Sequence, residues 1–140
     1  MSFRLHAKLR ADSTLVERRG SLQIRLHNDA RWPWVILVPS DDAYRELTEL
    51  SAHAAKQLWA SIGDISARLL AWSPVSKINI ACLGNLVPQL HIHVVGRWQA
   101  DPAWPGPIWG RAEPRSYAAI ERKRLTAHLK MQANAALVPA

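Results

Sequence analysis

Two segments in the first third of the chain have the hydrophobic pattern of paired strands. Residues 22–27 alternate apolar and polar side chains with period two, which predicts a half-buried strand. Residues 34–38 form a continuous run of β-favouring side chains that ends at Pro39, as is typical of a central strand. The polar residues 28–31 between them predict a turn, so we expect the two strands to form a hairpin.

Helical periodicity dominates the middle of the chain. Across residues 43–72, apolar side chains recur at the three- and four-residue spacing of one long helix. Pro114 opens a second, shorter helix that we expect to run from Ser116 to about Leu129, within residues 114–130. The tail after Met131 is expected to be frayed.

Two more strands are predicted after the long helix. Residues 77–82 alternate apolar and polar side chains, and the pair Gly84-Asn85 then forms a turn. Residues 89–95 follow as a strand, and a loop rich in Trp, Pro and Gly spans about 98–113. No linker divides the chain, so we expect residues 1–140 to form one domain with its core at about 20–100.

Composition narrows the class of protein. Hydrophobic residues make up 49% and charged residues 21%, which is ordinary for a folded domain and excludes a disordered chain. No run of 18 apolar residues occurs, so no membrane span is expected. The single cysteine, Cys82, excludes an internal disulfide framework, and the first residues lack the apolar core of a signal peptide. The cytoplasm is the expected compartment.

Charge points to an anionic partner. With 18 basic and 11 acidic residues the formal net charge is +7, which favours a nucleotide, a nucleic acid or an acidic surface. The basic residues are scattered along the chain, and no helix-turn-helix, zinc-finger or aromatic RNA-binding signature is present. Nucleic acid is therefore not the partner we expect.

One strand carries an unusual row of polar side chains. Side chains alternate between the two faces of a strand, so Gln89, His91 and His93 are expected on one face and Leu90, Ile92 and Val94 on the other. Two imidazoles and an amide are a poor core, because each buried polar group needs a partner. The row is therefore a candidate functional site.

The segment from Gly84 to Arg97 resembles the signature of the histidine triad (HIT) family, a His-φ-His-φ-His-φ-φ strand in which φ is apolar. The order of predicted elements across about residues 20–100 is also similar to the order found in the HIT family. The resemblance implies an α+β fold with about five antiparallel strands, one long helix and a smaller C-terminal helix. It also implies a homodimer that binds a nucleotide or nucleotidyl conjugate and transfers or hydrolyses nucleotidyl groups without a metal or other cofactor.

The resemblance assigns roles to four residues. The nucleophile falls on His91, whose neutral imidazole would attack an α-phosphorus and form a nucleotidyl-histidine that water resolves. His93 takes the third triad position and would hydrogen-bond the phosphate or the surroundings of the nucleophile. Asn85 lies where a polar side chain approaches the phosphate or leaving group, and Gly84 lets backbone amides come close.

Two positions depart from the family pattern. The first triad position is Gln89, which can donate a hydrogen bond but cannot carry a proton to a leaving group. The hydroxyl residue expected two positions after the glycine is replaced by Leu86. We therefore expect substrates with good leaving groups, such as nucleotides or polyphosphates, to be favoured over phosphoramidates.

Four further residues are candidates for substrate binding. The resemblance places a sugar-binding residue at Asn28 or Asp29, although either can instead form an Asx turn. Arg97 meets a phosphate, contacts a dimer partner or simply ends its strand. Trp32 lies near the expected base pocket, where an indole can stack on a purine.

The local sequence also predicts the places of three other tryptophans and of four histidines. Trp34 is expected to pack in the core, whereas Trp104 and Trp109, held in a rigid Pro/Gly loop, would suit a lid or a dimer seam. Four histidines have no recognisable surroundings in the sequence and are expected at ordinary positions: His6, His27, His53 and His128.

Two other functions remain open from the residues alone. A His-x-His pair on a strand also presents metal ligands, and a distant His27 or Asp29 would have to complete such a site. Alternatively, a weakly active or inactive relative of the HIT family binds nucleotides without turning them over.

Overall fold

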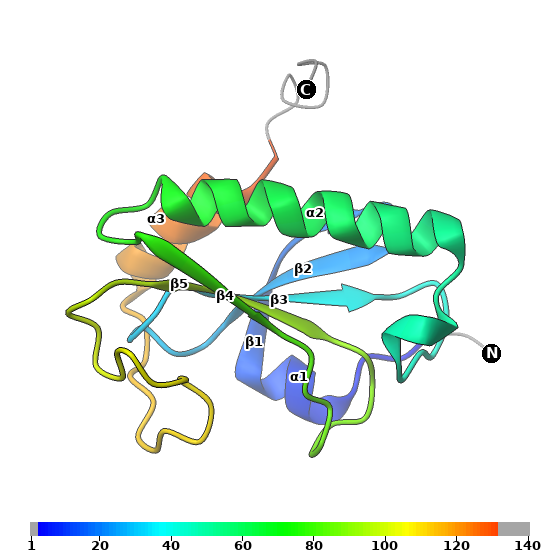
Figure 1. Cartoon of the computed structure of the whole chain (residues 1–140), viewed down its shortest axis with the longest axis horizontal. Coiled ribbons are helices and arrows are strands. Elements are labelled where there is room, and N and C mark those ends of the chain that lie inside the picture. The colour runs from blue at the N-terminus through cyan, green and yellow to red at the C-terminus, as the bar shows by residue number, and fades with distance from the viewer. Residues whose placement is uncertain (1–2, 132–140) are drawn as a thin grey trace.

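The computed structural model describes residues 3–131 as one five-stranded antiparallel sheet with helices on both faces (Figure 1). Its elements in chain order are α1 (Ala7–Asp12), β1 (Ser13–Arg19), β2 (Leu22–His27), β3 (Trp34–Pro39), the 3₁₀ turn η1 (Leu47–Glu49), α2 (Ala52–Leu70), β4 (Lys77–Ala81), β5 (Ile92–Arg97) and α3 (Ala119–Leu129). The expected α+β fold with a long helix and a smaller C-terminal helix is confirmed. The tail predicted to fray after Met131 lies outside the described residues.

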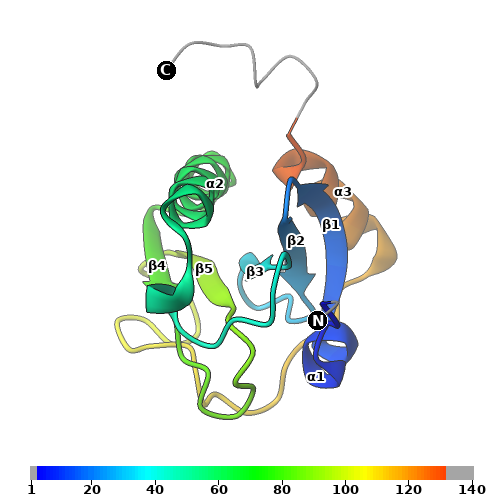
Figure 2. The same ribbon diagram turned by 90° about the vertical axis from the view of Figure 1, so that its right-hand side faces the viewer.

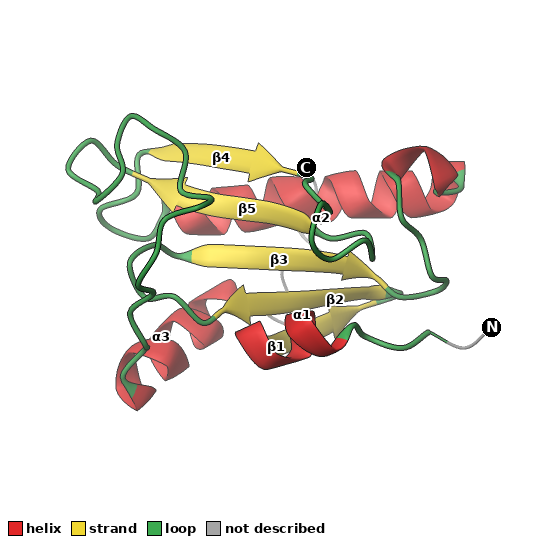
Figure 3. Ribbon diagram, turned by 90° about the horizontal axis from the view of Figure 1, so that it is seen from below, coloured by secondary structure: helices red, strands yellow, loops and turns green. Residues whose placement is uncertain are grey.

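The strands lie in the order β1-β2-β3-β5-β4 (Figure 3). β3 and β5, which carry Trp34 and His93, are therefore neighbours inside the sheet. β2 and β3 form the expected hairpin, with Leu22 opposite Pro39 and Leu26 opposite Val35. β5 then pairs antiparallel with β3 on one side and with β4 on the other. Because β5 is flanked by strands on both edges, the backbone of His93 is paired with Ile36 on one side and with Ala81 on the other.

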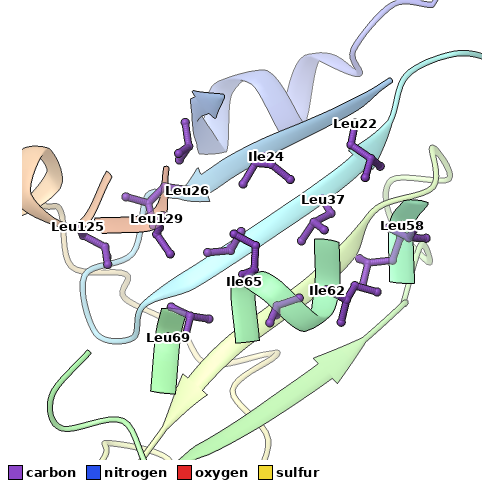
Figure 4. Packing of buried hydrophobic residues seen from close by; sticks show 14 of the residues in the cluster. Leu22, Ile24, Leu26, Leu37, Leu58, Ile62, Ile65, Leu69, Leu125 and Leu129 are labelled. Carbon is purple, nitrogen blue, oxygen red and sulfur yellow. The ribbon is translucent and has the colours of Figure 1, made fainter. Parts of the chain in front are cut away.

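The larger core lies between the sheet and the helices α2 and α3 (Figure 2). One stripe of α2, including Leu58, Ile62 and Ile65, packs on apolar residues of β2 and β3 such as Ile24 and Leu37 (Figure 4). Leu125 and Leu129 of α3 close the same core. This layer secures one face of the sheet and leaves the opposite face for the N-terminal segment and the functional site.

A second apolar cluster covers part of that opposite face. It brings Leu5 and Leu9 of the N-terminal segment against Trp34 and Ile36 of β3, together with Val87 from the loop before β5. Because β3 is apolar on both faces, it contributes to both clusters, as its continuous hydrophobic run predicts.

Three predicted boundaries are wrong. Helix α2 begins at Ala52, where the Ser51 hydroxyl accepts a hydrogen bond from the backbone N–H of Ala54, and not at residue 43. The preceding stretch is anchored elsewhere, because the carbonyl of Tyr44 accepts a hydrogen bond from the N–H of Leu90. α3 begins at Ala119. β5 begins at Ile92, three residues later than expected.

Besides the 3₁₀ turn η1, two elements were not predicted. Helix α1 is short, and strand β1 carries a register shift between Leu15 and Glu17 that interrupts its alternation. The charged run Glu17-Arg18-Arg19 further hides the strand pattern. β1 is nevertheless the fifth strand of the sheet.

Candidate functional site

A cavity of about 540 Å³ opens on the face of the sheet opposite α2, within the size range of small-molecule sites. His91 and His93 both line it, and each is only 6% exposed. Their apolar neighbours Leu90, Ile92 and Val94 belong to the core under α2, so the expected separation of the two histidines from these apolar residues is confirmed. The two imidazole centroids are 4.9 Å apart.

The hydrogen bond of His91 defines which of its nitrogens is free. Nδ1 lies 2.7 Å from the backbone carbonyl oxygen of Gln89. Because a carbonyl oxygen only accepts, Nδ1–H donates, and a neutral His91 then has its lone pair on Nε2. His91 is therefore oriented as a nucleophile or a base.

The hydrogen bond of His93 has the opposite polarity. The indole N–H of Trp34 donates to Nδ1 of His93 at 2.9 Å. Since an indole can only donate, a neutral His93 carries its proton on Nε2 and remains a donor there. The pair thus combines one acceptor and one donor in a single cavity.

Burial disfavours the charged forms of His93 and His27. Burial, with smaller contributions from the nearby His91 and His27, lowers the pKa of His93 from 6.5 to about 3. Burial also lowers the pKa of His27, against the opposing effect of Asp12 and Asp29. At neutral pH His93 therefore acts as a neutral hydrogen-bond donor.

Aromatic rings form a wall of the cavity that the sequence did not indicate. His27, expected at an ordinary position, lines the cavity and stacks on Trp34 with ring centroids 3.9 Å apart. Trp109 reaches the same cavity, with its ring centroid 5.6 Å from that of His93. The only sequence signal for His27 was its place at the end of a strand paired with β3. Trp104 lies beside Arg97 instead, with its ring centroid 5.6 Å from the guanidinium carbon.

The loop between β4 and β5 supplies the remaining predicted cavity residues. Gly84 and Asn85 both line the cavity, as does Leu86, whose side chain is 86% exposed. Gly84 has a φ of 73°, a conformation that favours glycine. The loop therefore brings the backbone and one amide side chain to the cavity beside His91.

Gln89 is placed differently from the two histidines. Its side chain does not line the cavity but bonds to the N-terminal segment, accepting from the N–H of His6 and donating to the carbonyl of Arg4. The row of three side chains expected on one strand face is thus interrupted, because the strand begins only at Ile92.

Arg97 lies in a buried ion pair away from the cavity. Its guanidinium bonds Asp101 through Nε at 2.7 Å and also donates to Asn79 Oδ1 and the carbonyl of Gly106. Burial alone would raise the pKa of Asp101, but the hydrogen bonds from Arg97 and from backbone N–H groups outweigh it and lower the pKa to about 2. Arg97 thereby ties the start of the loop that carries Trp109 to the sheet.

The residues expected near the sugar and base also make internal contacts. The Asn28 amide oxygen accepts from the Thr14 hydroxyl. Asp29 is buried and bonds the Arg31 guanidinium as well as the N–H groups of Arg31 and Arg115, so it joins the β2–β3 turn to the chain before α3. Trp32 is 1% exposed within the second apolar cluster. None of the three lines the cavity.

Within residues 3–131, no three His, Cys, Asp or Glu side chains gather as a candidate metal site. None of the described helices combines the length and apolar character needed to cross a membrane.

Fold and site together define an α+β protein with two neighbouring imidazoles at the start of an inner strand, His91 just before β5 and His93 within it. The HIT domain family profile matches residues 8–100. The chain is similar to the crystal structure of a histidine triad protein from Sinorhizobium meliloti, with 38% identity over 91% of this chain and 94% of that one, and a TM-score of 0.87.

Two further crystal structures give the same result. A histidine triad protein from Marinobacter aquaeolei is 38% identical over 93% of this chain and 95% of that one, with a TM-score of 0.88. One from Bradyrhizobium japonicum is 34% identical over 92% and 96%, with a TM-score of 0.88. A search of curated proteins found no match.

The chain belongs to the HIT domain family. This family comprises nucleotide-binding proteins that are generally hydrolases or transferases.

Proposed function

We propose that the protein binds a nucleoside phosphate in the cavity beside His91 and cleaves it through a covalent nucleotidyl-His91 intermediate. The observation that carries the proposal is the complementary pair of tautomers: Nε2 of His91 holds a lone pair and Nε2 of His93 holds a proton. A lone pair beside a neutral donor suits attack on phosphorus with a hydrogen bond to a phosphoryl oxygen.

The reaction proceeds in two displacements. The lone pair of His91 Nε2 forms a bond to the α-phosphorus, and the P–O bond to the leaving group breaks with its electron pair on that oxygen. Water then attacks the same phosphorus, the P–N bond breaks, and the water proton passes to solvent. His93 donates from Nε2 to a phosphoryl oxygen in both steps, and Asn85 lies at the same cavity for the phosphate or leaving group.

The leaving group departs without a proton from the first triad position. Gln89 has no ionisable group, and its amide is hydrogen-bonded to Arg4 and His6. Phosphates, whose conjugate acids ionise below neutral pH, leave without protonation, whereas an amine does not. Nucleoside polyphosphates and nucleotide conjugates linked through phosphate are therefore the proposed substrates.

The aromatic wall supports a nucleoside as the group retained on His91. His27, Trp34 and Trp109 border the cavity, and planar rings of this kind stack on nucleobases. We propose that the nucleobase binds against this wall. The internal contacts of the other candidates indicate instead that they position the surrounding chain: Asn28, Asp29, Trp32 and Arg97.

The test is product formation from a dinucleoside polyphosphate, a nucleotide sugar and a nucleoside phosphoramidate, followed by chromatography with chelator-treated protein. We expect release of a mononucleotide that disappears in His91→Asn. His53→Asn, which changes an exposed histidine on α2, is the matched control and should keep the wild-type rate.

Each result has a defined meaning. Turnover by His91→Asn at the wild-type rate would refute the covalent mechanism. No turnover of any substrate, with mononucleotide binding intact, would make the protein a nucleotide-binding member of the family without this hydrolytic activity.

We further infer that two copies of the chain associate through β4 and α2. β4 is the last strand of the sheet order, and its outer edge has no partner strand among the described residues. An apolar groove of about 480 Å³ runs beside it, where Trp59 is 71% exposed and Ile80 is 48% exposed. An open strand edge next to a continuous apolar surface favours pairing with a second copy.

Light scattering after size-exclusion chromatography tests this association. We expect a dimer that becomes a monomer in Trp59→Glu and in Ile80→Lys. Ile120→Lys changes an exposed apolar residue on α3 and should leave the mass unchanged. A monomeric wild-type protein at the concentrations used for activity would refute the dimer.

A further inference from the structure

We propose that Gln89 is a positioning residue that fastens the N-terminal segment as one wall of the nucleotide cavity. The inference rests on the proposed nucleotide site but assigns to Gln89 a role other than that of a triad acid. The carboxamide and the backbone of Gln89 act in two different directions, one toward the N-terminal segment and one toward the nucleophile.

The carboxamide pairs with the backbone as another peptide group would. Its oxygen accepts from the N–H of His6 at 2.9 Å, and its nitrogen donates to the carbonyl of Arg4 at 2.9 Å. These partners lie more than 80 residues away along the chain, so the two bonds join the motif loop to the segment that leads into α1. An amide supplies a donor and an acceptor side by side, which neither a carboxylate nor a single imidazole nitrogen does.

The segment held by this pairing forms part of the cavity. Lys8, Leu9 and Asp12 of α1 all line it, and the buried Leu5 and Leu9 pack in the apolar cluster with Trp34. Displacing this segment would move the wall of the cavity without touching His91 or His93.

The backbone of the same residue orients the nucleophile. The Gln89 carbonyl accepts from Nδ1–H of His91, and substitution of the side chain leaves that carbonyl in place. Side-chain variants should therefore weaken nucleotide binding while the chemical step on His91 proceeds at close to its normal rate.

A substitution at His6 can remove the hydrogen bond from the His6 N–H to Gln89 without changing Gln89. Its φ is −55°, which proline can adopt, so His6→Pro removes the N–H that donates to Gln89 with the local backbone angle preserved. The His6 ring also accepts from the N–H of Lys8. His6→Ala loses that ring contact but keeps the N–H, so it is the matched control.

The experiment combines Gln89→Ala and His6→Pro in a double-mutant cycle. Binding of AMP is measured by calorimetry, amide hydrogen exchange is followed in α1, and single-turnover rates are taken at saturating substrate. We expect each single variant to bind AMP about fivefold more weakly than the wild type and to exchange amide hydrogens faster in α1. The double variant should bind AMP no more weakly than the weaker-binding of the two single variants. His6→Ala should stay closer to wild type, and Gln89→Glu, which keeps the acceptor but loses the donor, should fall between wild type and Gln89→Ala.

Several outcomes would overturn the assignment. Additive effects of the two substitutions, unchanged exchange in α1, or a loss confined to the single-turnover rate would each do so. A faster reaction on phosphoramidates in Gln89→His with unchanged AMP binding would also refute it, since the position would then serve as an acid. If wild-type protein binds no AMP, the proposed function fails, while hydrogen exchange still tests the pairing itself.

Discussion

The indole N–H of Trp34 donates to Nδ1 of His93 at 2.9 Å, and this bond joins the two central strands of the sheet on the face that carries the site. Trp34 lies on β3 opposite Val95 of β5, so its side chain reaches the neighbouring strand beside the histidine. The bond selects the His93 tautomer with the proton on Nε2, where a substrate phosphoryl oxygen can accept it.

Replacing Trp34 with Phe should remove the hydrogen bond that selects this tautomer of His93. An aromatic ring remains, but the donor to His93 is lost, and the imidazole can then protonate either nitrogen. We expect kcat to fall about tenfold, because part of the His93 population then has its proton on Nδ1 and cannot donate from Nε2 to the phosphoryl oxygen. The ¹⁵N chemical shifts of the His93 ring should report a single tautomer in the wild type and a mixture of two tautomers in Trp34→Phe.

Trp32→Phe is the control for that substitution. Trp32 is buried in the second apolar cluster and does not line the cavity, so kcat and the His93 shifts should be unchanged. Identical ring shifts in wild type and Trp34→Phe would show that the indole bond does not set the tautomer.

The stability of the protein should depend on His93 below neutral pH. Its pKa is depressed from 6.5 to about 3 by burial, so the unfolded state binds a proton before the folded state does. The stabilisation is complete above about pH 6.5 and is lost as the pH falls toward 3. We expect the free energy of unfolding, measured with urea, to decrease between pH 7 and pH 5.

His93→Asn separates this effect from the titration of carboxyl groups. The variant should lose less stability over the same pH interval, whereas His53→Asn, at an exposed position, should follow the wild-type profile. Parallel profiles for wild type and His93→Asn would contradict the prediction.

The ion pair between Arg97 and Asp101 should contribute strongly to stability. Both side chains are almost fully buried, at 1% and 0% exposure, so Asp101→Asn leaves a buried guanidinium without its counter-charge. We expect a loss of about 3 kcal/mol in the free energy of unfolding. Asp12→Asn breaks the exposed pair with Lys8 and should cost less than about 1 kcal/mol. A similar small loss for both variants would show that the buried pair is not stabilising.

Trp109→Ala should affect substrate affinity more than the chemical step. The ring borders the cavity next to His93 but makes no hydrogen bond to either histidine, and its own indole N–H is buried without a partner. We expect KM to rise about tenfold with kcat nearly unchanged, as for the loss of a stacked aromatic. An equal fall in kcat with constant KM would place Trp109 in the transition state instead.

Local patterns in the sequence were enough to identify the β2–β3 hairpin, the long helix, β4 and the histidine strand, because each depends on side-chain periodicity within a few residues. The same periodicity placed His91 and His93 opposite Leu90 and Ile92, and the family signature led to Gly84 and Asn85. β1 could not be recognised, because a register shift and a charged run break its alternation. The start of α2 was misplaced, because Tyr44, Leu47 and Leu50, in and around the 3₁₀ turn η1, recur at helix-like spacing.

Only the tertiary structure decided which groups meet His91 and His93. His27, Trp109 and the α1 segment reach the cavity from strands and loops far apart in the chain, and no local pattern records such contacts. The same applies to Asp29 and Arg97, whose charged groups are satisfied by partners inside the fold, and to Gln89, whose amide bonds a segment more than 80 residues away. The sequence thus determined which side of one segment carries His91 and His93, whereas packing determined the bond from Trp34 that orients the His93 ring. That bond arises from long-range proximity, which the order of residues does not reveal, whereas His91 bonds the carbonyl of Gln89 only two residues earlier.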